Sequence, residues 1–269
     1  MPAAMGETQG RVLVIAGSDS GGGAGIQADI KTVTALGGYA ATAVTAITVQ
    51  NTLGVTGVHA IPTDIVLAQA RAVLDDIGAD AIKTGMLGSA EIVEAVADVL
   101  AGAGVPAVID PVMIAKGGAS LLADSALAAV RARLVPVAAL LTPNAPEAAT
   151  LTGLAVATTD DLRRAADALL AMGARAVLMK GGHVPGETVT DLLVTPDSET
   201  SFSGPRMDTR HTHGTGCTLA SAVAAGLAQG QRLETAVAQA WAYVAEAIRR
   251  APGFGAGAGP LDHGWPMRQ

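Results

Sequence analysis

The hydrophobic pattern of the chain alternates between short apolar runs and longer stretches in which apolar positions recur at helical spacing. Residues 11–16 are apolar and are followed by glycine, which is typical of a buried strand. A helix is expected at about 23–36, and the segment 39–51, rich in Val, Ile and Thr, predicts a second strand. Apolar positions behind Pro62 then predict a helix that stops at Gly78.

The same alternation continues through the rest of the chain. Further strands are expected at 80–85, 105–112, 138–144 and 175–182. A further helix is expected around residues 92–100, with Ile92 and Leu100 on its apolar face. Others are expected near 125–134, between Thr159 and Gly173, at 215–228 and at 233–250.

This order of elements predicts a three-layer α/β/α fold with a mostly parallel central sheet and helices on both faces. Residues 188–195 and 199–205, separated by Pro-Asp-Ser, predict a small hairpin near 188–203. Residues 1–10 are expected to be a flexible tail and 11–269 a single domain. The Gly- and Ala-rich segment 252–260 is expected to be a flexible closing segment.

Composition narrows the classes of function. Only 2% of the 269 residues are aromatic, and the formal net charge is −7. Such a chain is unsuited to nucleic acid, although a small anion could still bind at helix N-termini, lysines or a metal. The single cysteine cannot form an internal disulfide, no basic leader precedes the first apolar run, and no apolar run is long enough to span a membrane. We therefore expect a cytoplasmic protein without a membrane partner.

Polar side chains follow directly after many of the predicted strands. Ligands of open α/β sheets bind at the carboxyl ends of the strands. Ordinary loop polarity explains any one of these residues, but their recurrence indicates a ligand site. The residues are Gly17, Ser18, Asp19, Gln50, Asn51, Lys83, Thr84, Asp110, Asn144, Lys180 and His183.

The glycine-rich stretch GSDSGGGAGIQAD, residues 17–29, has two interpretations. Its glycines would let the backbone approach a ligand, or they would simply permit a tight turn. The stretch does not complete the G-x-G-x-x-G spacing of dinucleotide-binding folds, and it lacks the G-K-[ST] ending of a P-loop.

The stretch HGTGCT, residues 213–218, is more informative. Backbone N–H groups of Gly214, Thr215, Gly216 and Cys217 at a helix start would form an anion cradle supported by the helix dipole. The same dipole would favour the thiolate of Cys217, which could accept or steer a proton from an attacking hydroxyl. The alternative is a buried structural cysteine.

The stretch TPNAPEA places Asn144 and Glu147 on one helix face. Such a pair could order water around a nucleotide-bound Mg²⁺, and the alternative is an ordinary helix start with an acidic residue at its positive end. Lys180 could neutralise phosphate or merely end a strand.

Taken together, the stretches resemble the ribokinase-like superfamily, and within it the hydroxymethylpyrimidine and phosphomethylpyrimidine kinases of thiamine biosynthesis. The motifs run through nearly the whole chain in this order: AGSDSGGGAGIQADIKT, AVTAITVQNT, KTGML, DPVM, TPNAPEA, MKGGH and THGTGCTL. In the wider superfamily an aspartate usually stands at the position of Cys217. With a cysteine at this position, the chain resembles the pyrimidine kinases and their pyridoxal kinase relatives.

The resemblance implies a ribokinase-like fold and transfer of the ATP γ-phosphoryl group to 4-amino-5-hydroxymethyl-2-methylpyrimidine, followed by a second transfer to the monophosphate. It implies a homodimer, with ATP and Mg²⁺ as cofactors. It also implies roles for particular residues. Asp29 and Gln50 would contact the aminopyrimidine edge, and Gly17, Met86 and Val112 would surround the ring. Gly214, Thr215, Gly216 and Cys217 would contact the migrating phosphoryl group. The nucleotide would be bound by Asn144, Lys180, His183 and Lys116, the last on a flap, and the metal would be held largely through water by Asp110 and Glu147.

Two alternatives stay open at this point. A pyridoxal or pyridoxine kinase would use the same cysteine-type cradle on another hydroxymethyl heterocycle. A non-catalytic vitamin-binding protein could use the same scaffold, although Asn144, Glu147, Lys180 and Cys217 argue for catalysis.

Overall fold

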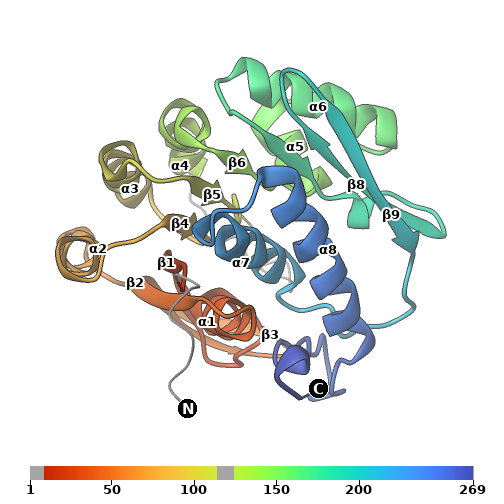
Figure 1. Cartoon of the computed structure of the whole chain (residues 1–269), viewed down its shortest axis with the longest axis horizontal. Coiled ribbons are helices and arrows are strands. Elements are labelled where there is room, and N and C mark those ends of the chain that lie inside the picture. The colour runs from red at the N-terminus through yellow and green to blue at the C-terminus, as the bar shows by residue number, and fades with distance from the viewer. Residues whose placement is uncertain (1–8, 114–123, 269) are drawn as a thin grey trace, which may run out of the picture.

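The computed structural model describes residues 9–113 and 124–268 (Figure 1). The strands in these residues are β1 (Arg11–Asp19), β2 (Tyr39–Asn51), β3 (Gly54–Ala60), β4 (Ala81–Thr84), β5 (Ala107–Ile109), β6 (Leu140–Leu141), β7 (Val177–Met179), β8 (Thr188–Val194) and β9 (Glu199–Pro205). They form one sheet in the order β3-β2-β1-β4-β5-β6-β7-β8-β9. β2, β1 and β4 to β7 are parallel, β3 is antiparallel to β2, and β8 is antiparallel to β7 and β9.

Helices cover both faces of this sheet, as the alternation of elements predicted (Figure 1). They are α1 (Gly25–Ala35), α2 (Thr63–Asp76), α3 (Ala90–Ala103), α4 (Asp124–Ala129), α5 (Ala145–Thr152), α6 (Thr159–Ala171), α7 (Thr215–Ala228) and α8 (Leu233–Arg249). α1, α7 and α8 pack on one face, and α2 to α6 pack on the other. Among the described residues, no helix combines the length and the apolar character that a membrane crossing requires.

β1 shows why the central strands are continuous apolar runs. Leu13 and Ile15 belong to the core beneath α2 to α6, whereas Val12 and Val14 belong to the core beneath α1, α7 and α8. Successive side chains of a strand point to opposite faces, so a strand covered on both sides has no polar face. The result is a rigid central sheet whose polar residues begin where the strands end.

The predicted bounds of strand 39–51 and helix 215–228 are confirmed, and so is the hairpin, formed by β8 and β9. β3 was not predicted. Glycines at 54 and 57 weaken its strand pattern, and antiparallel pairing with β2 is what holds it extended.

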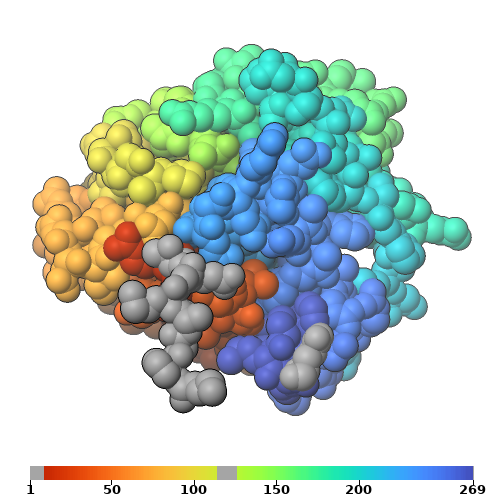
Figure 2. Space-filling view, in the orientation of Figure 1, coloured from red at the N-terminus to blue at the C-terminus, as the bar shows by residue number. Residues whose placement is uncertain are grey.

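The prediction that 252–260 is a flexible closing segment is wrong. The N–H groups of Gly257 and Ala258 donate to the hydroxyl and the carbonyl of Thr52, at 3.2 and 2.9 Å. A Cβ on Gly257 would lie 2.1 Å from the Thr52 carbonyl oxygen, so glycine is required for this approach. Figure 2 shows the chain end, in dark blue, packed beside α8 and α1.

The predicted N-terminal tail, 1–10, can be compared only at its last two residues, because 1–8 lie outside the described part. Gly10 is buried, and its carbonyl accepts the N–H of Tyr39 at 2.9 Å. A Cβ on Gly10 would lie 2.6 Å from the carbonyl carbon of Ala228. Gly10 therefore belongs to the packed structure and not to a tail.

Candidate active site

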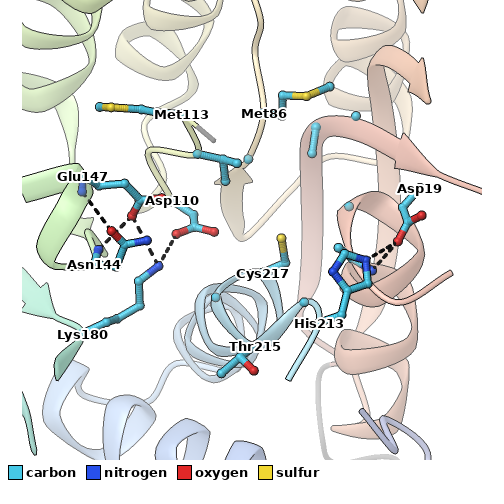
Figure 3. A pocket seen from close by; sticks show the side chains of 18 of the residues that line it. Asp19, Met86, Asp110, Met113, Asn144, Glu147, Lys180, His213, Thr215 and Cys217 are labelled. Atoms are coloured by element: carbon cyan, nitrogen blue, oxygen red, sulfur yellow. Dashed lines mark hydrogen bonds and ion pairs between the residues drawn. The ribbon is translucent and has the colours of Figure 1, made fainter. Parts of the chain in front are cut away.

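A cavity of about 560 Å³ opens at the carboxyl ends of the parallel strands, beside the first turn of α7 (Figure 3). Most of the residues singled out from the sequence line it. They are Gly17, Gln50, Met86, Asp110, Val112, Asn144, Glu147, Lys180, His183, Gly214, Thr215, Gly216 and Cys217. Lys116 lies outside the described residues. The sheet thus brings together segments that are far apart in the sequence.

Asp29 does not occupy the place expected for a substrate contact. It is fully buried beneath the cavity, and both of its carboxylate oxygens lie 2.9 Å from Nζ of Lys83. The hydroxyl of Ser221 donates to Oδ1 at 2.6 Å. These partners occupy the carboxylate, so Asp29 supports the floor of the cavity instead of reaching the ligand.

One end of the cavity has an apolar wall beside the polar side chains of Asp19, Gln50 and His213. Met86 and Val112 belong to this wall, and the hydroxyl of Thr45 donates to the carbonyl of Met86 at 2.6 Å. A Cβ on Gly17 would lie 2.4 Å from Cε of Met86, so the glycine leaves the space that the methionine fills. This end suits a flat heterocycle.

α7 begins beside this apolar end. Gly214 is its N-cap, with φ 82 in the left-handed region, and a Cβ there would lie 1.8 Å from the carbonyl oxygen of Gly23. The N–H of Thr215 makes a long contact of 3.4 Å with the Thr212 carbonyl. First-turn amides such as those of Gly216 and Cys217 have no acceptor within their own helix, and they line the cavity. The anion cradle of Gly214 to Cys217 therefore stays a prediction, in which the N–H of Thr215 is partly occupied by Thr212.

Cys217 lies in the first turn of α7 with its sulfur facing the cavity (Figure 3). Burial outweighs the expected preference of the helix dipole for its thiolate. Burial raises the pKa of the thiol to about 11, the carboxylates of Asp29 and Asp110 add to the effect, and Lys83 opposes it. Cys217 is thus a protonated thiol at neutral pH.

The other end of the cavity is charged. Nζ of Lys180 lies 2.8 Å from Oδ1 of Asp110 and 3.8 Å from Oε2 of Glu147 (Figure 3). Burial alone would lower the pKa of Lys180, but the two carboxylates outweigh it and raise the pKa. Lys180 therefore presents a permanent positive charge to the cavity.

Asn144 and Glu147 form the start of α5. Oδ1 of Asn144 accepts the N–H of Glu147 at 2.9 Å, and Oε2 of Glu147 accepts the N–H of Asn144 at 2.8 Å. This is a capping box, so the ordinary helix start that the sequence left open is present. Both residues still line the cavity, and burial raises the pKa of Glu147 to about 7, Lys180 opposing the rise and Asp110 adding to it.

Asp19 and His213 lie 2.9 Å apart, Oδ2 to Nε2, and both line the cavity. The sequence placed Asp19 among the polar residues at strand ends and His213 at the start of HGTGCT, but it gave neither an individual role. Their positions inside the two glycine-containing motifs were the available signal.

Ribokinase-like kinases have a three-layer α/β/α fold with the cavity at the strand ends and at a helix N-terminus. This chain is such a kinase. It belongs to the phosphomethylpyrimidine kinase family, whose model matches residues 19–262. The prediction of a kinase of this family is confirmed.

Individual relatives agree with this placement. A hydroxymethylpyrimidine/phosphomethylpyrimidine kinase of Streptomyces coelicolor is 57% identical over 95% of each chain. A solved phosphomethylpyrimidine kinase from Clostridium difficile is 41% identical, with a TM-score of 0.80 over 89% of this chain and 100% of that one. The pyridoxal kinase from Staphylococcus aureus, solved with AMP-PCP and pyridoxal, is 35% identical, with a TM-score of 0.88 over 96% and 94%.

Proposed function

We propose that the protein transfers the γ-phosphoryl group of ATP to the hydroxymethyl group of 4-amino-5-hydroxymethyl-2-methylpyrimidine, and a second phosphoryl group to the resulting monophosphate. One observation carries the proposal. The first turn of α7 lies between a charged end that contains Lys180 and an apolar end that contains Met86 and Val112 (Figure 3). Nucleotide phosphates suit the charged end, and a flat heterocycle suits the apolar one.

Phosphoryl transfer depends on position and charge more than on covalent chemistry with the protein. The amides of Gly216 and Cys217 stand at the positive end of the α7 dipole, where negative charge on the migrating group is stabilised. Lys180 adds a fixed positive charge, and Asn144 and His183 line the same end. These groups act on the phosphates, whereas the acceptor alcohol lies at the apolar end.

The protonation state of Cys217 shapes its role in this proposal. A thiol with a pKa of about 11 is a hydrogen-bond donor at neutral pH. A loose transition state requires little removal of the alcohol proton before the phosphoryl group moves. Cys217 therefore holds the acceptor oxygen in line and is not required to ionise first.

Two carboxylates at the charged end would suffice for a Mg²⁺ held largely through water, and the described residues contain no larger cluster of metal-binding side chains. Asp110 and Glu147 offer carboxylate oxygens, the ligands that Mg²⁺ prefers, and few protein ligands are needed because the ion keeps several waters. Burial is the main cause of the raised pKa of Glu147, and the charge of Asp110, which a cation would offset, adds to it. A bound Mg²⁺ would neutralise phosphate charge, with Asp110 and Glu147 holding it largely through water.

At the apolar end, Gln50 is the polar group for the aminopyrimidine edge. Its side-chain amide offers both a donor and an acceptor, and an amino group next to a ring nitrogen offers the complementary pair. Gly17, Met86 and Val112 enclose the ring.

Counting the phosphates added is the direct test. Purified protein is incubated with ATP, Mg²⁺ and the pyrimidine alcohol, and the products are separated by mass. We expect the monophosphate first and the diphosphate later. ATP that is not consumed in the presence of the alcohol contradicts the proposal.

Pyridoxal kinase activity is the second candidate, since the Staphylococcus aureus pyridoxal kinase superposes so closely. Parallel assays with pyridoxal decide between the two. A preference for pyridoxal of about tenfold or more in kcat/KM, equal to about 1.4 kcal/mol, would favour that function.

A homodimer in the cytoplasm completes the proposal. Ile47, Val49, Leu53 and Val58 are exposed on β2 and β3 and between them, and such an apolar edge favours association. Light scattering of the purified protein measures the assembly directly, and a monomeric mass at micromolar concentration contradicts the dimer.

A further inference from the structure

Asp19 is a buried carboxylate that gathers several donors. Its Oδ1 accepts the N–H of Gly21 at 2.8 Å, and its Oδ2 accepts those of Gly23 and Ala24 at 3.1 and 2.8 Å. Oδ2 also lies 2.9 Å from Nε2 of His213. Burial alone would raise the pKa of Asp19, but these hydrogen bonds outweigh it and lower the pKa. The group is therefore a charged carboxylate, which can only accept.

The charge on Asp19 fixes a proton on His213. Because the carboxylate only accepts, Nε2 of His213 must carry the hydrogen that joins them. The same Nε2 lies 3.3 Å from the side-chain amide nitrogen of Gln50, and two N–H groups cannot bond to each other. A half-turn of the amide places its oxygen against Nε2 of His213, whose single hydrogen is then shared between Asp19 and this oxygen. The same half-turn directs one hydrogen of the amino group to the hydroxyl of Thr48, which lies 3.1 Å from the other end of the amide, and leaves the second hydrogen for a ligand. The shared imidazole N–H thus selects this orientation.

His213 also joins two backbone segments at the cavity. A Cβ on Gly23 would lie 2.5 Å from Cδ2 of His213, and a Cβ on Gly214 would lie 1.8 Å from the Gly23 carbonyl oxygen. From the other side, the Gly259 carbonyl accepts the N–H of His213 at 3.1 Å. The imidazole is therefore held rigidly between the glycine-rich turn and the start of α7.

We propose that Asp19 and His213 are positioning residues for the heterocycle. Asp19 holds the N–H of His213 in place, and His213 orients the amide of Gln50 so that the amino hydrogen not donated to Thr48 is presented to an acceptor nitrogen of the bound ring. The inference rests on the proposed function, because that function makes Gln50 the contact for the aminopyrimidine edge.

The test compares binding at the two ends of the cavity by titration calorimetry. Wild type, His213→Ala, His213→Gln and Asp19→Asn are titrated with the pyrimidine alcohol in the absence of nucleotide, and separately with ADP. We expect His213→Ala to weaken pyrimidine binding about tenfold or more, with ADP binding changed less than about threefold. Asp19→Asn should act in the same direction.

His213→Gln distinguishes positioning from mere packing. Its amide N–H can still donate to Asp19, so it should recover pyrimidine binding to within about threefold of the wild type. His59→Ala is a matched control, because His59 is exposed on β3 away from the cavity, and its binding constants should equal those of the wild type.

Equal weakening of ADP and pyrimidine binding in His213→Ala would overturn the inference, and so would unchanged pyrimidine binding or a His213→Gln variant as weak as His213→Ala. The wild-type turnover assay separates this from the proposed function. A wild type that binds ADP but neither binds nor phosphorylates the pyrimidine contradicts both. If the wild type phosphorylates the pyrimidine, the results for the variants test only the positioning role of Asp19 and His213.

Discussion

Cys217 is a thiol at the centre of the cavity that resists ionisation. Alkylating reagents react with the thiolate, and a pKa of about 11 instead of 9.0 lowers the thiolate fraction at pH 8 by roughly a hundredfold. We expect iodoacetamide to modify the folded protein slowly, with a rate that keeps rising toward pH 11. Mass spectrometry follows the reaction cleanly, because the chain has one cysteine. Equal rates for folded and urea-unfolded protein would contradict the raised pKa.

Lys83 and Asp29 form a fully buried ion pair beneath that thiol. Burial alone would lower the pKa of Lys83, but the carboxylates of Asp29 and Asp110 outweigh it and raise the pKa. Lys83→Met leaves the carboxylate of Asp29 without its cation, so we expect the free energy of unfolding to fall by about 3 to 5 kcal/mol in urea titrations. The double variant Lys83→Met/Asp29→Leu should lose less. If the double variant loses as much stability as Lys83→Met and Asp29→Leu lose together when measured singly, the two side chains are not a coupled pair.

At the scale of elements, the two ends of α7 allow a matched comparison. Gly214 and Gly230 flank the helix with nearly equal φ values of 82 and 80, but a Cβ on Gly230 meets nothing within 4 Å, whereas one on Gly214 meets the Gly23 carbonyl. Gly230→Ala should cost about 1 to 2 kcal/mol of stability and leave kcat unchanged. Gly214→Ala should cost more stability and lower kcat by about a hundredfold, because the cradle must move.

Steady-state kinetics and thermal unfolding of the two variants check this prediction. If both variants keep the wild-type kcat, the contact between Gly214 and Gly23 does not set the position of the cradle.

Most elements follow from patterns that the sequence displays locally. The Val-, Ile- and Thr-rich run of β2 and the small-residue helix α7 have bounds that match the prediction, since their composition and their flanking residues are visible in the local sequence. The C-terminal segment 252–260 could not be predicted in this way. Its composition is that of a flexible chain, and contacts with residues distant in the sequence, such as Thr52 and His213, hold it in place.

The candidate site shows the same division. Residues at strand ends were predictable, because the fold class brings strand ends together. Asp29 was misplaced, because the motif reveals its nearness to the cavity but not that Lys83 and Ser221 occupy it. The contact between Asp19 and His213 joins residues 194 positions apart, and no local sequence pattern predicts it.

For the whole molecule, Glu147 gives a measurable pH dependence. Its pKa is raised from 4.5 to about 7 in the folded protein, so its contribution to stability is greatest below pH 4.5 and is lost as the pH rises toward 7. Glu147→Gln keeps the capping box and does not ionise. We therefore expect the stability of the variant relative to wild type to increase by about 1 to 3 kcal/mol from pH 4.5 to pH 8.

Chemical unfolding at several pH values, with EDTA present so that no metal binds, measures this difference. A relative stability that does not change with pH would mean that Glu147 titrates normally.

The packing of the chain end has a consequence for biosynthesis. Carbonyl and N–H groups of residues 257 to 259 bond to Thr52 and His213 at the rim of the cavity. Residues 257 to 259 are synthesised after all nine strands of the sheet. The nascent polypeptide can therefore assemble β1 to β9 before it is able to close this rim.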